Sequence, residues 1–534
     1  MFDTMPTPAS VQQASSAFVE PSRGNRVFAA LLGRSPALPA VALGLLAAVL
    51  SALGSWIPSF WGDEAASVMS ATRSWDSLWP MLARVDAVHG AYYVVMHLWI
   101  DAFGASPFSV RLPSAIAVGF TVAGLVVLAA RLANPRVALF AGLVCAVLPR
   151  VTFMGSETRG YALSAACAVW LTVLLVGLMR TRETRVLPWA GYAVGLAASV
   201  YVFLYLALIV VVHAVILLSV TPRGRVFVDR MLRAWAFAAA SGIALAAPVI
   251  VLAITERQQI AFLRDRRQMD AELLLVDQWF STAWLAALCW SVIAAGVGVA
   301  AFALWRRSLH GGSKAVRFRA LERADAVAPH PLVVGLAWLV LPCALLLLLN
   351  ALTPSYTIRY LSFAAPAAAL IIGWTLDLPR RRWVPWLVIA GIAAGAAPSY
   401  LDQRAPFAKD AGSDWAALAS TIEAKAQPGD GVIFDESTKP SRRPRLAMHL
   451  YPESFGGLVD VALQTPYDST DRLWDRVYPE ADWPALPSMT DRVWLVESGA
   501  SDFGMSALVQ LGYTVHGSIW LNRSTVYELT RGGL

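Results

Sequence analysis

Residues 37–65 read ALPAVALGLLAAVLSALGSWIPSFWGDEA, and this stretch decides the fold. Its apolar part, 37–56, is long enough as a helix, at ~1.5 Å per residue, to cross a hydrocarbon core about 30 Å thick. We therefore predict an uncleaved membrane anchor rather than a secretory signal. The stretch ends in two adjacent carboxylates, Asp63 and Glu64. Burying such groups is costly without a cation or donor, so they indicate a metal ion, a basic substrate or an acceptor hydroxyl at the membrane surface.

The composition indicates a polytopic membrane protein with a soluble C-terminal section. Of the 534 residues, 57% are apolar and 15% are charged, whereas soluble domains carry about 25% charge. Residues 401–534 hold 18 acidic and 12 basic residues, and residues 1–400 hold 18 and 31. We predict a disordered cytoplasmic segment at 1–35, a membrane domain at 36–400 and a soluble α/β domain at 401–534. The bases lie in separate short loops, which does not favour nucleic-acid binding.

Apolar runs after residue 65 predict ten further crossings, eleven in all. The run at 186–220 is too long for one crossing, so we expect two helices with a break near Ser199. The short run at 137–149 is expected to begin nearer Asn134. The runs lie at about 109–130, 137–149, 160–179, 186–220, 234–254, 280–304, 331–350, 359–376 and 383–399.

The distribution of basic residues predicts the orientation in the membrane. Alternate loops are rich in arginine and lysine, and these segments are 23–34, 131–136, 180–185, 223–233, 306–323 and 380–382. The positive-inside rule then places the N-terminus in the cytoplasm and residues 401–534 outside a plasma membrane. This requires that 89–104 is a re-entrant or surface helix and not a crossing. The mixed-charge loop at 256–277 falls outside too, where a loop of this length is often a lid.

The first outer loop, 57–108, is expected to hold two short helices, near 64–71 and 76–83. It continues with Asp86, His89 and the paired Tyr92-Tyr93, and Arg111-Leu112-Pro113-Ser114 opens the next crossing. In this order the motifs resemble those of GT-C glycosyltransferases. More narrowly, they are similar to the glycosyltransferase-39-like bacterial branch, which is related to protein mannosyltransferases and to the aminoarabinose transferase. The resemblance covers the membrane part and implies a GT-C fold.

The resemblance implies that Asp63 is the catalytic carboxylate, binding a divalent metal (Mg²⁺ or Mn²⁺), the acceptor or both. Transfer from a phosphate-linked sugar needs a base for the hydroxyl and neutralisation of the leaving phosphate. The alternative is a carboxylate that caps a helix start. Glu64 is a second catalytic candidate, or only a first-turn carboxylate favoured by the helix dipole. Asp86 could bind the metal with Asp63 or fix the acceptor, and its alternative is a solvated loop acid.

His89 is predicted to be a metal ligand or to polarise a phosphate, with outer packing as the alternative. Relatives often have Pro-Pro where this chain has Gly90-Ala91, which leaves the local geometry open. Tyr92 and Tyr93 are predicted to face the sugar or lipid, although interfacial aromatics are common anchors.

Two further segments are expected at the outer face. Ser156-Glu157-Thr158-Arg159-Gly160-Tyr161 resembles a "QEARSY"-like segment of the branch. Its Glu157 and Arg159 would line the pocket, or pair with each other. Tyr356-Thr357-Ile358-Arg359-Tyr360 matches an Arg-Tyr pair of relatives, with both tyrosines in the pocket.

Two arginines are candidates for the donor phosphate. Guanidinium binds phosphate bidentately and stays charged, which favours Arg359, and the alternative is a snorkelling arginine. Arg111 is the second candidate, or it holds the first loop in place.

The C-terminal section alternates helix and strand signals. Helices are expected at 413–426 and 506–511, and strands at 431–434, 458–463, 493–496, 514–521 and 524–529. A Rossmann-like arrangement is one alternative, but GxGxxG and P-loop motifs are lacking, so nucleotide binding is not indicated. The basic run at 440–445 could touch acceptor or lipid headgroups, or be a solvated loop.

Together these features predict an outward-facing glycosyltransferase that uses a polyprenyl-phosphate sugar. The resemblance alone implies that the sugar is mannose or arabinofuranose. It also implies that the acceptor is a cell-envelope glycolipid or polysaccharide. We expect the acceptor hydroxyl to displace the phosphate directly, with inversion at the sugar. The competing class is a lipid or glycan transporter without transfer chemistry. Transporters place ionisable residues near the bilayer midplane within repeats, whereas here the charges gather at one face.

Overall fold

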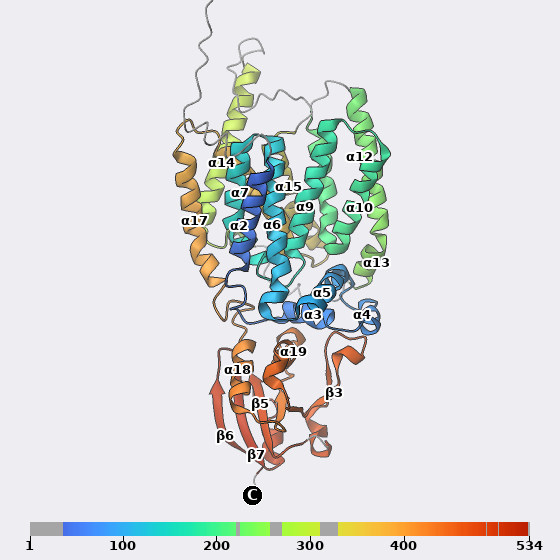
Figure 1. Cartoon of the computed structure of the whole chain (residues 1–534), viewed down its shortest axis with the longest axis vertical. Helices are drawn as coiled ribbons and strands as arrows, with labels where there is room; N and C mark the ends of the chain where they lie inside the picture. Colours follow the sequence, from blue (N-terminus) through green and yellow to red (C-terminus); the bar gives the residue numbers. More distant parts are fainter. Residues whose placement is uncertain are drawn as a thin grey trace, which may run out of the picture.

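The structure, a computed structural model, describes residues 36–220, 225–256, 270–309, 329–486, 489–499 and 501–531. The predicted disordered segment 1–35 and most of the predicted lid, 257–269, lie outside these ranges. Figure 1 shows a bundle of long helices, a thin layer of short helices at one end of it, and a C-terminal domain beyond that layer.

The bundle follows the predicted apolar runs. Among the described residues, six helices are long and apolar enough to cross a membrane, and the bent pair α12–α13 adds a seventh span. Four shorter apolar helices occupy the other predicted segments, so the helices are consistent with eleven crossings. The bundle consists of α2 (Ala37–Ala52), α6 (Pro107–Leu132), α7 (Pro135–Val147), α9 (Tyr161–Thr181), α10 (Val186–Val202), α11 (Ile209–Leu218), α12 (Arg225–Leu245), α13 (Ala247–Thr255), α14 (Ala283–Leu309), α15 (Pro331–Leu352), α16 (Ala365–Thr375) and α17 (Val384–Asp402).

Local sequence sets where these helices begin, break and touch. The Asn134 side chain caps α7 by accepting hydrogen bonds from the N–H groups of Arg136 and Val137, as the predicted start implied. The run 186–220 breaks at Phe203, four residues beyond the predicted Ser199, and continues as the 3-10 turn η2 (Leu204–Leu208). Between α2 and α6, a Cβ on Gly44 would lie 2.8 Å from the Gly119 carbonyl oxygen. Only small residues permit that approach of two helix backbones.

Residues 57–108, the predicted first outer loop, form the layer between the bundle and the C-terminal domain. It contains α3 (Gly62–Ala71), α4 (Trp75–Leu82), the turn η1 (Ala87–His89) and α5 (Gly90–Phe103). The helix α5 packs on α3 at the end of the bundle, so 89–104 does not cross it, as predicted (Figure 1). One buried apolar cluster joins this layer to the C-terminal domain, and it includes Phe60, Val68, Tyr93, Trp415 and Leu446.

The C-terminal domain is built on a five-stranded mixed sheet in the order β2-β1-β5-β7-β6. Strand β1 runs parallel to β2 and β5, whereas β7 pairs antiparallel with β5 and β6, so the sheet is not a Rossmann arrangement. The elements are α18 (Trp415–Lys425), β1 (Gly431–Phe434), α19 (Leu446–Leu450), β2 (Val459–Asp460), β5 (Arg492–Ser498), α20 (Met505–Gln510), β6 (Tyr513–Trp520) and β7 (Ser524–Arg531).

A separate pair of short strands, β3 (Leu463–Thr465) and β4 (Arg476–Val477), leaves this sheet. We call residues 463–477 the β3–β4 arm. The arm extends toward α4 in the first-loop layer (Figure 1).

Candidate active site

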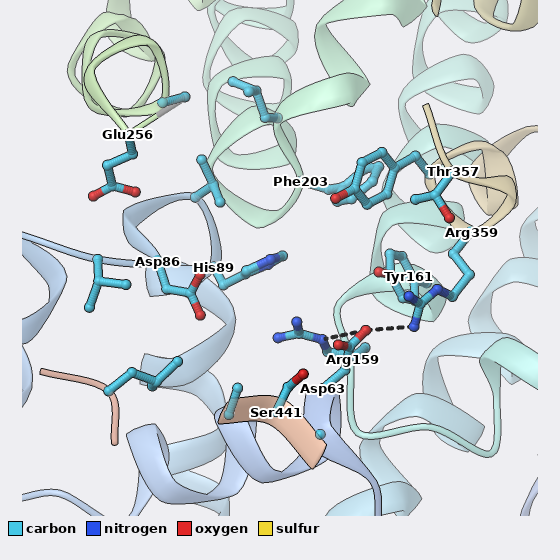
Figure 2. Close-up of a pocket in the computed structure, with 18 of the residues that line it drawn as sticks. Asp63, Asp86, His89, Arg159, Tyr161, Phe203, Glu256, Thr357, Arg359 and Ser441 are labelled. Atoms are coloured by element: carbon cyan, nitrogen blue, oxygen red, sulfur yellow. Dashed lines mark hydrogen bonds and ion pairs between the residues drawn. The ribbon is translucent and has the colours of Figure 1, made fainter. Parts of the chain in front are cut away.

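A cavity of about 450 Å³ lies where the bundle, the first-loop layer and the C-terminal domain meet. Six predicted site residues line it: Asp63, Asp86, His89, Arg159, Arg359 and Tyr360. Figure 2 shows these groups arranged around the cavity, with Asp63 and Arg359 at one end and Asp86 and Glu256 at the other. Sequence segments almost three hundred residues apart therefore share one site, with Arg359 donating to Asp63 at 2.5 Å.

Asp63 lies between two guanidinium groups. Its Oδ2 is 2.5 Å from Nη1 of Arg359 and 3.9 Å from Nε of Arg159. The Asp63 side chain, on α3, is about one quarter exposed. The ring of Trp61, just before this helix, lies 4.7 Å from the guanidinium carbon of Arg359. Burial would raise the pKa of Asp63, but Arg359 and Arg159 outweigh it and hold that pKa below its usual range. Asp63 is therefore ionised at neutral pH.

A hydrogen-bonded chain connects Arg159 to Asp86. Nη1 of Arg159 donates to the Tyr93 hydroxyl at 3.3 Å, and that hydroxyl donates to Oδ2 of Asp86 at 2.7 Å. Burial and the neighbouring Asp86 raise the pKa of Tyr93, so the phenol keeps its proton. Asp86 itself adopts a left-handed backbone with φ 60°, a conformation that aspartate tolerates better than most residues. Tyr93 thus positions Asp86 rather than facing the cavity, where it was predicted.

His89 and Glu256 complete the end of the cavity near Asp86. Burial, together with Arg159, lowers the pKa of His89 to about 4, so its imidazole is neutral near pH 7. Oε2 of Glu256, at the end of α13, accepts the Ala87 N–H at 3.2 Å, and burial raises its pKa. A neutral imidazole can accept or donate a hydrogen bond, but it cannot supply a permanent charge to a phosphate.

Glu64 and Arg111 do not line the cavity. They form a fully buried, two-pronged ion pair, with Nε to Oε1 at 2.8 Å and Nη2 to Oε2 at 2.5 Å. Nη1 of Arg111 also donates to the carbonyl oxygens of Ser55 and Pro58, at 2.6 and 2.8 Å. This placement does not support a catalytic Glu64 or a phosphate-binding Arg111. It matches the alternative that Arg111 holds the first loop in place.

Three other predicted pocket residues, Glu157, Tyr356 and Tyr92, do not line the cavity. Glu157 is fully buried, and both of its carboxylate oxygens lack a hydrogen-bond partner among the described residues. Burial raises the pKa of Glu157, and Lys409 opposes this. Tyr356 donates its hydroxyl proton to Oε1 of Gln278 at 2.7 Å, and Tyr92 is buried against Gly160. The alternative, a Glu157–Arg159 ion pair, is absent from the described contacts, because Arg159 turns toward Asp63 and Tyr93 and lines the cavity as predicted.

The cavity also has lining residues that were not predicted individually as site residues. Tyr161 and Thr357 lie in two segments that were expected at the outer face, and Ser441 lies in the basic run that could touch acceptor or lipid headgroups. No prediction was made for Phe203, Leu204, Tyr205, Leu473 and Trp474. Tyr205 stacks on Tyr360 with ring centroids 4.9 Å apart, next to the helix break at Phe203. The predicted break in the apolar run 186–220 could have indicated that the cavity lies here. Non-helical backbone at membrane depth is tolerated only where protein or a cavity surrounds it.

The predicted metal ligands Asp63, Asp86 and His89 are not grouped around one point in this structure. Among the described residues, no group of three histidine, cysteine, aspartate or glutamate side chains is placed to hold a metal ion. Oδ2 of Asp63 is engaged by Arg359, and Oδ2 of Asp86 by Tyr93. The metal set Asp63, Asp86 and His89 stays a prediction, and we derive no step through it.

The fold has known counterparts. Residues 91–252 match the family model described as dolichyl-phosphate-mannose-protein mannosyltransferase. The crystal structure of ArnT from Cupriavidus metallidurans in the apo state superposes with a TM-score of 0.55 at 13% identity, covering 92% of this chain and 98% of that one. ArnT bound to undecaprenyl phosphate gives 0.54 at 13% identity, covering 92% and 97%. No curated protein matches the chain by sequence.

This similarity extends over nearly the whole chain, including the C-terminal domain. The protein therefore has the fold of these structures, which is the GT-C fold that the sequence motifs implied. The resemblance seen in the sequence motifs is confirmed at the level of the fold, and residues 91–252 match a mannosyltransferase family model.

Proposed function

We propose that the protein transfers a sugar from a polyprenyl-phosphate donor to a hydroxyl of a cell-envelope glycolipid or polysaccharide at the outer face of the plasma membrane. The observation that carries this proposal is an ionised Asp63 held between Arg359 and Arg159 in the cavity. Two parts of the cavity then suit the donor: the guanidinium end suits its phosphate, and the apolar residues on the bundle side suit its lipid.

The donor phosphate fits the guanidinium end of the cavity. Two arginines surround one carboxylate there, so this end carries a surplus positive charge. Arg359 and Arg159 are largely buried, with side chains 17% and 9% exposed, and a phosphate would be bound in a partly desolvated setting. Charge-assisted hydrogen bonds to phosphate are stronger than neutral ones, and arginine can make two in parallel.

The lipid part of the donor fits the bundle side of the cavity. Phe203, Leu204 and Ala253 line that side, and an apolar groove of about 640 Å³ follows α12 and α13. Ile250 and Val251 border the groove, and Ala253, on the same helix, borders the cavity. A polyprenyl chain could therefore lie along the bundle while its phosphate reaches Arg359. The ArnT structure bound to undecaprenyl phosphate supports this choice of carrier.

Transfer then needs little rearrangement at Asp63. The donor phosphate takes over the Arg359 guanidinium, which frees Oδ2 of Asp63 to accept the proton of the acceptor hydroxyl. The hydroxyl oxygen attacks the anomeric carbon from the face opposite the phosphate. The new carbon–oxygen bond forms as the bond to the phosphate oxygen breaks, and the electron pair leaves with the polyprenyl phosphate. Arg359 and Arg159 neutralise that phosphate, and the configuration inverts.

Mannose and arabinofuranose are the proposed sugars. The family model that matches residues 91–252 is described by dolichyl-phosphate mannose, which supports mannose in particular. The orientation follows from the base-rich loops.

The test is sugar transfer by the purified protein. Radiolabelled polyprenyl-phosphate mannose or arabinose is supplied with a lipid extract, and wild type is compared with Asp63→Asn. Loss of the base should lower transfer by about 10²–10⁴-fold. Asp76→Asn, an exposed acid on the neighbouring helix α4, is the matched control and should keep wild-type activity. Undiminished transfer by Asp63→Asn contradicts the role of Asp63, and energy-dependent lipid movement without transfer favours the transporter.

A further inference from the structure

The C-terminal domain forms one wall of the cavity. Ser441, Leu473 and Trp474 come from that domain, whereas Phe203 and Ala253 come from the bundle. Figure 2 shows Ser441 on its ribbon beside Asp63. The cavity thus has a wall on the bundle side and a wall on the domain side, with the proposed base between them.

The β3–β4 arm that carries Leu473 and Trp474 is firmly anchored to the first-loop layer. Arg73 is 1% exposed, and its Nη1 donates to the carbonyl oxygen of Thr470 at 2.8 Å while its Nη2 donates to that of Arg472. The Tyr467 ring lies 5.0 Å from the same guanidinium carbon. A buried arginine whose donors go to backbone carbonyls of one short segment fixes the path of that segment.

Further contacts hold both ends of this wall. Asp475 accepts from the Tyr467 N–H at 2.8 Å and lies 2.6 Å from Nε2 of His449 in the domain itself. At Gly62, the first residue of α3, a Cβ would lie 2.1 Å from the carbonyl oxygen of Ser441. The domain therefore touches the helix of Asp63 directly, and only glycine allows that contact.

We propose that this wall is the acceptor site, and that the acceptor presents a carbohydrate ring to the indole of Trp474. The inference rests on the proposed transfer activity. On the bundle side, Phe203, Leu204 and Ala253 suit the lipid of the donor and Arg359 suits its phosphate, which leaves the side of the C-terminal domain for the acceptor hydroxyl. A half-buried tryptophan offers a flat apolar face to the C–H groups of a sugar ring, and Ser441 offers a hydroxyl to its oxygens. A peptide acceptor is the other class, which the test distinguishes.

The experiment measures KM for donor and acceptor separately in the full-length protein. Octyl-linked mannose and arabinofuranose oligosaccharides serve as acceptors, and a serine- and threonine-containing peptide is the comparison. Trp474→Leu keeps apolar bulk without an aromatic face, and Trp474→Phe restores a face. We expect the acceptor KM to rise roughly tenfold in the leucine variant and to stay near wild type in the phenylalanine variant, with donor KM unchanged in both. Trp520→Leu, at a tryptophan 71% exposed on β6, is the matched control.

The outcomes separate the two proposals. Wild-type transfer with equal acceptor KM in the leucine and phenylalanine variants would overturn the acceptor wall and leave the proposed function standing. A joint rise of donor and acceptor KM would also overturn it, because a general distortion of the site is not acceptor recognition. Preferred transfer to the peptide overturns the carbohydrate assignment, and no transfer by wild type to any acceptor overturns both proposals.

Discussion

Removing one partner or the other of the buried Glu64–Arg111 pair should lower the stability in two ways, one independent of pH and one that depends on pH. Glu64→Gln leaves the Arg111 guanidinium buried without a counter-charge, because the amide and the carbonyl oxygens of Ser55, Pro58 and Ser59 are all neutral acceptors. Breaking a buried ion pair by removing one partner costs about 3–5 kcal/mol of folding free energy. Arginine does not titrate below pH ~12, so this loss should be constant between pH 5 and 8.

Arg111→Met leaves the carboxylate instead. In wild type, burial raises the pKa of Glu64, but Arg111 outweighs it and holds that pKa below its ordinary value. Glu64 therefore stabilises the wild type above its unfolded pKa of ~4.3, and this contribution is lost as the pH falls below that range. In Arg111→Met, Glu64 keeps the Thr158 N–H at 3.0 Å, while Lys409 donates to the Ser156 carbonyl oxygen. The pKa of Glu64 in the folded variant should then exceed its unfolded value of ~4.3. The free energy of unfolding of Arg111→Met should therefore fall as the pH rises through that pKa.

The assay is unfolding in mixed micelles by titration with sodium dodecyl sulfate between pH 5 and 8. Titration of Glu64 should change the stability of the wild type little between pH 5 and 8. The stability of Glu64→Gln should be lower by a constant amount. The loss of stability in Arg111→Met should shrink as the pH falls toward 5. The double variant should lose less than the two single losses together, because it leaves no unpaired charge. An Arg111→Met curve parallel to wild type would refute the reasoning, because it would mean that Glu64 is not a buried carboxylate that depends on Arg111.

Two further predictions concern the cavity. Arg359→Lys keeps the charge but loses the planar guanidinium that can donate two parallel hydrogen bonds. The donor KM should rise about 10- to 100-fold, in line with the roughly 1.5–3 kcal/mol of a charged hydrogen bond. An unchanged donor KM would show that Arg359 does not bind the donor phosphate. Gly62→Ala places a Cβ 2.1 Å from the Ser441 carbonyl oxygen, so the C-terminal domain should be cleaved faster by limited proteolysis and transfer should fall, whereas Gly191→Ala, with no atom within 4 Å of its Cβ, is the matched control. Equal cleavage of both variants would contradict that contact.

The sequence predicted the helices, and the gathering of polar residues at one end of the bundle, because both follow from physics that acts locally. Apolar runs of membrane length and caps such as Asn134 locate helices without knowledge of their neighbours. The cavity walls depend instead on which distant segments meet. Trp474 lies between two short strands of the C-terminal domain, and neither composition nor spacing indicates that it lines a cavity shared with the membrane helices. The same limit applies to the basic run at 440–445, because Arg445 turns inward, 3% exposed, and pairs with Glu436 and Asp460.

The different placements of Asp63 and Glu64 show what a residue pattern can and cannot predict. Successive residues on an α-helix point about 100° apart, so neighbours on α3 cannot face the same cavity unless the helix stands end-on to it. Asp63 faces the cavity and meets Arg359, whereas Glu64 faces the interior and is fully buried against Arg111. The sequence supplies two carboxylates and two arginines but not the rotation of the helix that matches them. That rotation is set by packing, in particular by the Gly62–Ser441 contact on one side and the buried Arg111 network on the other. The buried Glu64 thus helps to fix the direction in which its neighbour Asp63, the proposed base, points.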